Sequence, residues 1–250
     1  MEFYTNPMPR MYYAEGEAEC EPDFDNYEKC PLCGDTVGHV PKRPYTVVLK
    51  GRVRTRPMPD CLHIWTWFFN AFSKKVVDAI EKYGITGIEY YEKADRYIYK
   101  KETLDFDYYI PKVKRIELPT DYERSCISWL QNTTPKEICP LCTPQPRVSF
   151  QYMSLLFKTD KYDGTDIFKT YEHGGMIFFS QKFVDMVKAE GFTNFNFLST
   201  RLLGAEFLTS FCHSYGDHGE KDESYRKWLH LSPEEYYGYI DSIKKTTDFK

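Results

Sequence analysis

The residues best suited to chemistry in this chain are two pairs of cysteines. Cys30-Pro-Leu-Cys33 and Cys139-Pro-Leu-Cys142 are the same tetrapeptide, which occurs twice. A gap of two residues lets both thiolates of a pair turn toward one ion, and two such pairs form the closed tetrahedral site of zinc ribbons. We therefore predict that these four cysteines hold one structural Zn²⁺ per chain. An open catalytic zinc would need a missing fourth ligand and a general base, and the sequence indicates neither.

The competing interpretation of the cysteine pairs is redox chemistry. A Cys-Pro-x-Cys pair serves an oxidoreductase when its first cysteine begins a helix that follows a strand. The residues after Cys33 read Gly-Asp-Thr-Val-Gly and those after Cys142 read Thr-Pro-Gln-Pro, and neither run begins a helix. A thiol enzyme that uses Cys30 or Cys139 is therefore the less favoured alternative.

The other candidate ligands have no matching partners. Cys20, Cys61, Cys126 and Cys212 lack paired spacing, which favours buried structural thiols. His213 and His218 fall in a polar run over residues 213–224 that reads as an exposed surface loop. The sequence contains no phosphate-binding glycine loop, nucleophile elbow or HExxH motif, so we expect a protein that is not an enzyme.

An internal repeat indicates which elements position the cysteines. Residues 72–92 and 179–198 each predict a capping serine, an amphipathic helix, a glycine at the helix end and a strand. The predicted strands cover residues 85–91 and 192–198. The identical positions are Phe72/Phe179, Ser73/Ser180, Lys75/Lys182, Val77/Val184, Asp78/Asp185, Gly84/Gly191 and Thr86/Thr193.

Most of the remaining sequence predicts strands. Residues 45–56, 96–118 and 147–157 have strand patterns, and Ser232 opens a capping box for a final helix that ends near Lys245. One face of the first of these strands is basic, which could contact phosphates or could simply be a solvated edge. The basic residues are Lys50, Arg52, Arg54 and Arg56. A zinc-ribbon nucleic-acid-binding or regulatory protein is therefore the alternative function.

Composition limits the class of protein. The 250 residues are 42% hydrophobic and 17% aromatic, which excludes wholesale disorder. The formal net charge is −4, so nucleic acid is an unlikely partner. No apolar run is long enough to cross a bilayer, and the first residues do not resemble a signal peptide. We expect a cytoplasmic protein without a membrane partner.

These patterns together predict one α+β domain over residues 1–250. It would contain two related helix-on-antiparallel-sheet halves, at about 28–118 and 137–200, joined by a zinc-ribbon-like four-cysteine site. A C-terminal helical extension would cover residues 205–250.

The same motifs resemble a known bacterial family, the double-CXXCG motif proteins, over roughly residues 28–200. The resemblance is carried by Cys30–Gly34, Cys139–Cys142, Asp166–Phe168, Ile177–Val184 and Gly191–Phe197. This sequence departs from the pattern at Thr143, where the family has glycine, which puts the second turn in doubt more than its ligands. The resemblance implies that the four cysteines are metal ligands, and it implies no catalytic residue.

Some members of that family resemble immunity proteins of polymorphic or contact-dependent toxins. The resemblance therefore implies a protein that binds and neutralises one cognate toxin. Its mild acidity would speed the capture of a basic toxin, and its abundant tyrosines would suit an interface. The loop over residues 213–224 and the acidic residues before the final helix are candidate contact surfaces.

Overall fold

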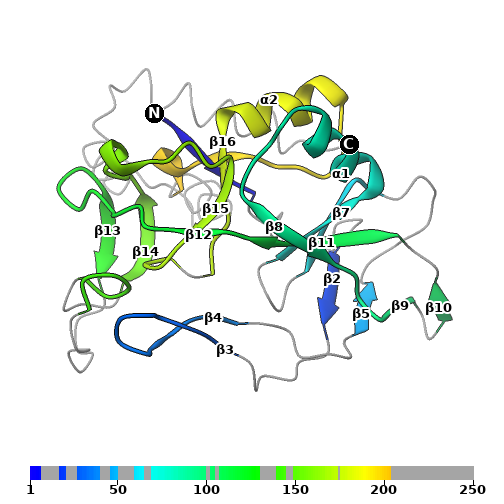
Figure 1. Ribbon diagram of the computed structural model, residues 1–250, viewed down its shortest axis with the longest axis horizontal. Helices are drawn as coiled ribbons and strands as arrows, with labels where there is room; N and C mark the ends of the chain where they lie inside the picture. Colours follow the sequence, from blue (N-terminus) through cyan, green and yellow to red (C-terminus); the bar gives the residue numbers. More distant parts are fainter. Residues whose placement is uncertain are drawn as a thin grey trace, which may run out of the picture.

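The structure is a computed structural model that describes residues 1–6, 17–20, 27–39, 46–49, 59–64, 69–99, 102–104, 107–129, 139–144, 149–173 and 175–203. These residues form a mixed α+β fold in which the helices α1 (Lys74–Lys82) and α2 (Gln181–Glu190) lie together on one side of the sheets. The hairpin of β3 (Tyr27–Lys29) and β4 (Thr36–His39) lies on the opposite side (Figure 1). Neither α-helix of the described residues is long and apolar enough to cross a membrane.

The first sheet has five strands in the order β12-β15-β16-β1-β17. Their bounds are β12 Arg115–Ile116, β15 Ile167–Thr170, β16 Phe178–Ser180, β1 Phe3–Thr5 and β17 Leu198–Ser199. β12 runs parallel to β15, and the other neighbours are antiparallel. The strand at the start of the chain, β1, is thus an interior strand that lies between β16 and β17.

The second sheet has eight strands in the order β10-β9-β5-β2-β6-β7-β11-β8. Their bounds are β10 Glu102–Leu104, β9 Arg96–Tyr99, β5 Thr46–Leu49, β2 Glu17–Cys20, β6 Cys61–Ile64, β7 Phe69–Ser73, β11 Tyr108–Val113 and β8 Ile88–Glu92. β2 is parallel to β6, and β5 is parallel to β9.

The expectation of antiparallel sheets is therefore wrong, because both sheets are mixed. Parallel neighbours require a long crossover connection, whereas antiparallel neighbours can be joined by a tight turn. In this chain the crossovers from β2 to β6 and from β12 to β15 are the segments that carry the cysteine pairs. Two short two-stranded sheets flank those pairs, formed by β3 Tyr27–Lys29 with β4 Thr36–His39, and by β13 Cys126–Trp129 with β14 Ser149–Ser154.

Both repeat segments form the predicted helices. α1 spans Lys74–Lys82 and α2 spans Gln181–Glu190. Ser180 caps α2 by accepting a hydrogen bond from the backbone N–H of Phe183, and Gly191 ends that helix in the left-handed conformation. Ser73 makes no such side-chain cap, and its hydroxyl donates to Asp60. The predicted cap is thus right for α2 and wrong for α1.

The faces of these helices pack into one core. Val76, Val77 and Ile80 form the buried face of α1, as expected of an amphipathic helix, but Tyr83 at the helix end is exposed. Phe183, Val184 and Val187 form the buried face of α2. The two helices contact each other, and an ion pair of 2.7 Å joins Lys82 to Glu190. The core therefore lies between the helix layer and both sheets.

The strands predicted after the helices are only partly correct. β8 begins at Ile88 rather than residue 85, and the second predicted strand is reduced to β17 at its end. Between α2 and β17 the aromatic side chains pack inward, with the rings of Phe195 and Phe197 stacked at 5.6 Å. Burial of aromatic surface replaces strand pairing over this stretch.

Several predictions concern residues outside the described ranges. They are the basic face at Lys50, Arg52, Arg54 and Arg56, the loop over 213–224 with His213 and His218, Cys212, and the helical extension over 205–250.

Candidate metal centre

The two predicted cysteine pairs meet in space. The Sγ atoms of Cys30, Cys33, Cys139 and Cys142 all lie within 4.8 Å of one another. The Sγ atoms of Cys30 and Cys139 are 3.9 Å apart, and those of Cys33 and Cys142 are 3.5 Å apart. A tetrahedral zinc with bonds of about 2.3 Å requires sulfurs about 3.8 Å apart. The donor set and its spacing fit one Zn²⁺.

Each pair lies on a tight turn of the same form. The backbone N–H of Gly34 donates to the carbonyl of Cys30 at 2.9 Å, and that of Thr143 donates to the carbonyl of Cys139 at 3.0 Å. Gly34 has a φ of 78°, whereas Thr143 closes its turn without a positive φ. The departure at Thr143 therefore leaves the second turn intact. Among the described residues no helix follows either turn, and a helix there is what the redox alternative would need.

The electrostatics of the cysteines favour a cation between them. Hydrogen bonds from the backbone N–H groups of Cys142 and Leu141 lower the pKa of Cys139 to about 6. Burial and the neighbouring sulfurs raise the pKa of Cys142. Thiolates this close together repel one another, and a coordinated divalent metal would offset that repulsion and deprotonate the thiols.

An apolar cluster surrounds the sulfurs. Cys30, Val37 and Cys139 are buried in it, and Leu141, Cys142 and Tyr171 pack against them. Because Cys33 is exposed, one side of the centre reaches solvent. This arrangement suits a closed site that staples the fold, since all four positions of the tetrahedron would be occupied by sulfur.

A charged cluster, which sequence reasoning missed, joins the first turn to the sheets. Glu28 of β3 forms ion pairs with Lys112 of β11 and with Arg115 of β12. Burial alone would raise the pKa of Glu28, but the hydrogen bonds from these two cations lower that pKa to about 2. Burial lowers the pKa of the nearby Lys169 to about 8. Because these partners are far apart in sequence, no local pattern could have revealed them.

A second missed group has the residue types of a thiol catalyst. The thiol of Cys61 contacts the Asn70 side chain at 3.6 Å, and His63 lies two residues further along the same strand. Cys61 is fully buried, and burial raises the pKa of its thiol well above the usual value. Burial lowers the pKa of His63 to about 4. A neutral thiol without solvent access is a structural residue, as predicted for Cys61.

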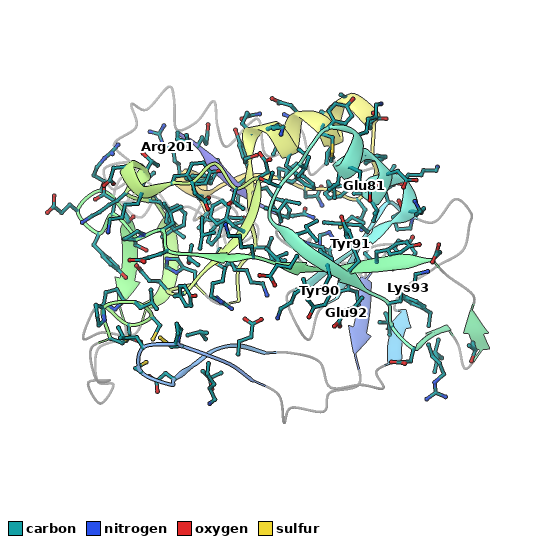
Figure 2. The ribbon with its side chains drawn as sticks, viewed as in Figure 1. Glu81, Tyr90, Tyr91, Glu92, Lys93 and Arg201 are labelled. Carbon is teal, nitrogen blue, oxygen red and sulfur yellow. The ribbon has the colours of Figure 1, made fainter. Side chains whose placement is uncertain are left out.

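The exposed surface offers few large aromatic side chains. Among the tyrosines whose burial is described, Tyr83 and Tyr90 are the exposed ones, and Tyr90 on β8 is 51% exposed. Tyr91 of the same strand packs against the core that α1 covers (Figure 2). In the described part of the chain, tyrosine therefore serves packing more than it serves a free surface.

The comparison with known families decides the class of this protein. The model of the Immunity protein family (Imm11) matches residues 38–201, well over half of the chain. The chain belongs to this immunity protein family. A search of curated proteins finds no match. An immunity family was the expectation, and the family found is Imm11; the double-CXXCG resemblance stays a prediction.

The region that matches Imm11 contains only one of the two cysteine pairs. It contains both helices, Cys139 and Cys142, but it begins after Cys30 and Cys33. The first cysteine pair therefore comes from outside the matched region and the second from inside it. The geometry brings them together across the two regions.

Proposed function

We propose that this chain is a non-enzymatic immunity protein that binds and neutralises one cognate bacterial polymorphic toxin in the cytoplasm. Membership of the Imm11 immunity family is the observation that carries this proposal. The buried state of Cys61 supports it, because a thiol that is neutral and closed to solvent has neither the thiolate form nor the access that nucleophilic catalysis needs.

Co-expression with the toxin encoded beside this gene tests the proposal. We expect growth to be rescued by this chain and not by an immunity protein encoded with a different toxin. Purified toxin and immunity protein should also form a stoichiometric complex in size-exclusion chromatography. Continued killing of cells that contain soluble immunity protein would disprove the toxin-neutralising role.

We propose further that Cys30, Cys33, Cys139 and Cys142 bind one structural Zn²⁺. The support is chemical, since four thiolates at these separations match the preference of zinc for tetrahedral sulfur ligands. When bound, the ion would supply charge balance and cross-linking rather than catalysis. The chain itself holds the sulfurs in place through its two turns and the apolar cluster around them.

We also propose that the chain is one domain that contains a duplication. The support is the recurrence of a strand, a helix and a left-handed residue at α1 and α2, with a glycine at 84 and at 191. The contact between α1 and α2 then packs equivalent elements against each other.

A further inference from the structure

The strands beside α1 and α2 pair in the same register. Cys61 of β6 lies opposite Phe72 of β7, just as Ile167 of β15 lies opposite Phe179 of β16. On the outer side, β2 runs parallel to β6 at His63 and Ile64, and β12 runs parallel to β15 at Lys169 and Thr170. The run β2-β6-β7-β11-β8 in one sheet therefore corresponds strand by strand to β12-β15-β16-β1-β17 in the other.

The fourth strand in each run comes from the other part of the chain. β11 pairs with β7 and β8, and β1 pairs with β16 and β17. In chain order, β1 precedes β2, β6, β7 and β8, whereas β11 precedes β12, β15, β16 and β17. The strand that opens each series is thus inserted into the sheet of the other series.

We propose that residues 3–92 and 108–199 are two copies of one unit that have exchanged their first strands within a single chain. These limits revise the predicted halves of about 28–118 and 137–200, because the first unit gains β1 and because β11 moves from the first half to the second unit. Each unit presents a slot between two of its strands, and the partner that fits the slot is the first strand of the other unit. The interface between the units is therefore an exchanged one, as in a swapped dimer whose subunits are fused.

Two equivalent side-chain clusters hold this interface. Asp60 accepts hydrogen bonds from the Ser73 hydroxyl at 3.1 Å and from both the backbone N–H and the hydroxyl of Thr193 at 3.0 Å. Asp166 accepts from the Ser180 hydroxyl at 2.7 Å, from the Thr86 N–H at 3.0 Å and from its hydroxyl at 3.2 Å. In both clusters the serine belongs to the same unit as the aspartate, and the threonine belongs to the other unit.

The backbone next to each threonine repeats the correspondence. Gly87 has a φ of 104° and approaches the carbonyl of Ile167, while Asn194 has a φ of 62° and donates from its side chain to the carbonyl of Cys61 at 2.7 Å. Ile167 and Cys61 are the equivalent first residues of β15 and β6. Positive φ is rare for a non-glycine residue, so its occurrence at Asn194, in the place equivalent to Gly87, supports one origin for the two contacts.

The four-cysteine centre has the same relation to the units. Each unit supplies one cysteine pair from its crossover, and the closest sulfurs join Cys30 to Cys139 and Cys33 to Cys142. Equivalent residues therefore face each other across the centre. A metal bound there would join the units at a third place, besides the exchanged strands and the two aspartate clusters.

Hydrogen–deuterium exchange on the full-length protein tests the exchanged strands. Tyr4→Pro removes β1 from its neighbours, because proline cannot donate a backbone hydrogen bond. We expect about tenfold faster exchange at Phe178–Ser180 and Leu198–Ser199, in the unit distant in sequence, with β6 and β7 still protected. Thr103→Pro in the edge strand β10 is the control, and it should affect β9 and β10 alone. Faster exchange of β6 and β7 with β16 protected would overturn the proposal.

A second pair of variants tests the equivalence of the units without a proline. Thr86→Ala and Thr193→Ala each remove one hydroxyl from an aspartate cluster. We expect both to lower the melting temperature by about 2–4 °C, and by the same amount within error. A variant that melts like the parent while its counterpart is destabilised would contradict equivalence. Because neither test involves the toxin, its outcome is separate from that of the immunity proposal.

Discussion

At the scale of single residues, the sulfur atoms of the two cysteine turns stand at separations that a divalent ion can bridge. Their spacing in sequence predicted the two pairs, and the fold places both pairs on one apolar cluster. Backbone hydrogen bonds lower the pKa of Cys139, whereas burial raises that of Cys142. A bound divalent cation would hold both as thiolates.

Replacing one ligand should remove the metal. For Cys142→Ser we expect loss of the bound zinc and a fall of the melting temperature by at least about 5 °C, because three thiolates leave the ion incompletely coordinated. Metal content by mass spectrometry and thermal melting give the two readouts. Leu32→Ser is the control, since Leu32 lies in the first turn and is 61% exposed. A Cys142→Ser protein that melts like the parent would disprove the shared centre.

Buried histidines should make the fold sensitive to mild acid. Burial lowers the pKa of His173 to about 3 in the folded chain, against about 6.5 when unfolded. Between these values the unfolded chain binds a proton that the folded chain excludes. Stability due to this group is therefore complete above pH 6.5 and is lost as the pH falls, by up to about 1.4 kcal/mol per pH unit.

His173→Gln should reduce that acid sensitivity. The variant should be less stable at pH 7, because the ring of His173 packs against Phe157 and Phe178 and bonds to Thr120. Between pH 7 and 5.5 the free energy of unfolding should nevertheless fall less in the variant than in the parent. The difference between the two losses should be about 1 kcal/mol. Urea titrations at the two pH values measure the difference. If parent and variant lose the same free energy of unfolding between the two pH values, the folded chain does not exclude the proton from His173.

At the scale of elements, one glycine allows the backbone just before β8 to approach β15 of the second unit closely. Gly87 lies just before β8 with a φ of 104°, and a Cβ there would lie 1.9 Å from the carbonyl oxygen of Ile167. Gly164 also has a positive φ of 84°, but a Cβ there would meet nothing within 4 Å. The two positions separate the cost of the backbone conformation from the cost of a clash.

Gly87→Ala should therefore cost far more than Gly164→Ala. We expect a loss of about 3–5 kcal/mol in the free energy of unfolding for the first and about 1 kcal/mol for the second. Denaturant unfolding of both variants gives the comparison. Similar losses would show that β8 can move away from β15 without cost, which the close approach at Gly87 does not allow.

The elements also show where periodicity is informative. The helical spacing of Val76, Val77 and Ile80 is typical of α1 and its buried face, because side chains three or four residues apart lie on the same face of a helix. The aromatic run after α2 predicted a strand but forms none until Leu198. Packing of its rings against the core is more favourable than pairing of its backbone in a sheet. A short window of sequence does not show which of the two arrangements is more stable.

At the scale of the whole molecule, metal removal should loosen the chain throughout. If one ion joins segments that begin more than a hundred residues apart, its loss releases a long loop and lowers the stability of both sheets together. We expect a chelator to lower the melting temperature in a single transition, which equimolar Zn²⁺ restores and Mg²⁺ does not. Two separate transitions, with only one of them shifted, would contradict a centre shared by the whole fold.

Sequence patterns were enough to predict the cysteine pairs, both helices, most strands from residue 96 to 118, and an immunity family. These follow from covalent spacing, from local periodicity and from motifs, which act over a few residues.

The neighbours of each strand, by contrast, are known from the fold and not from any sequence pattern. The parallel pairs, the exchange of β1 and β11, the cluster at Glu28 and the aspartate clusters all join residues far apart along the chain. Such contacts depend on the balance between loop closure and burial over the whole chain, and that balance leaves no local mark in the sequence.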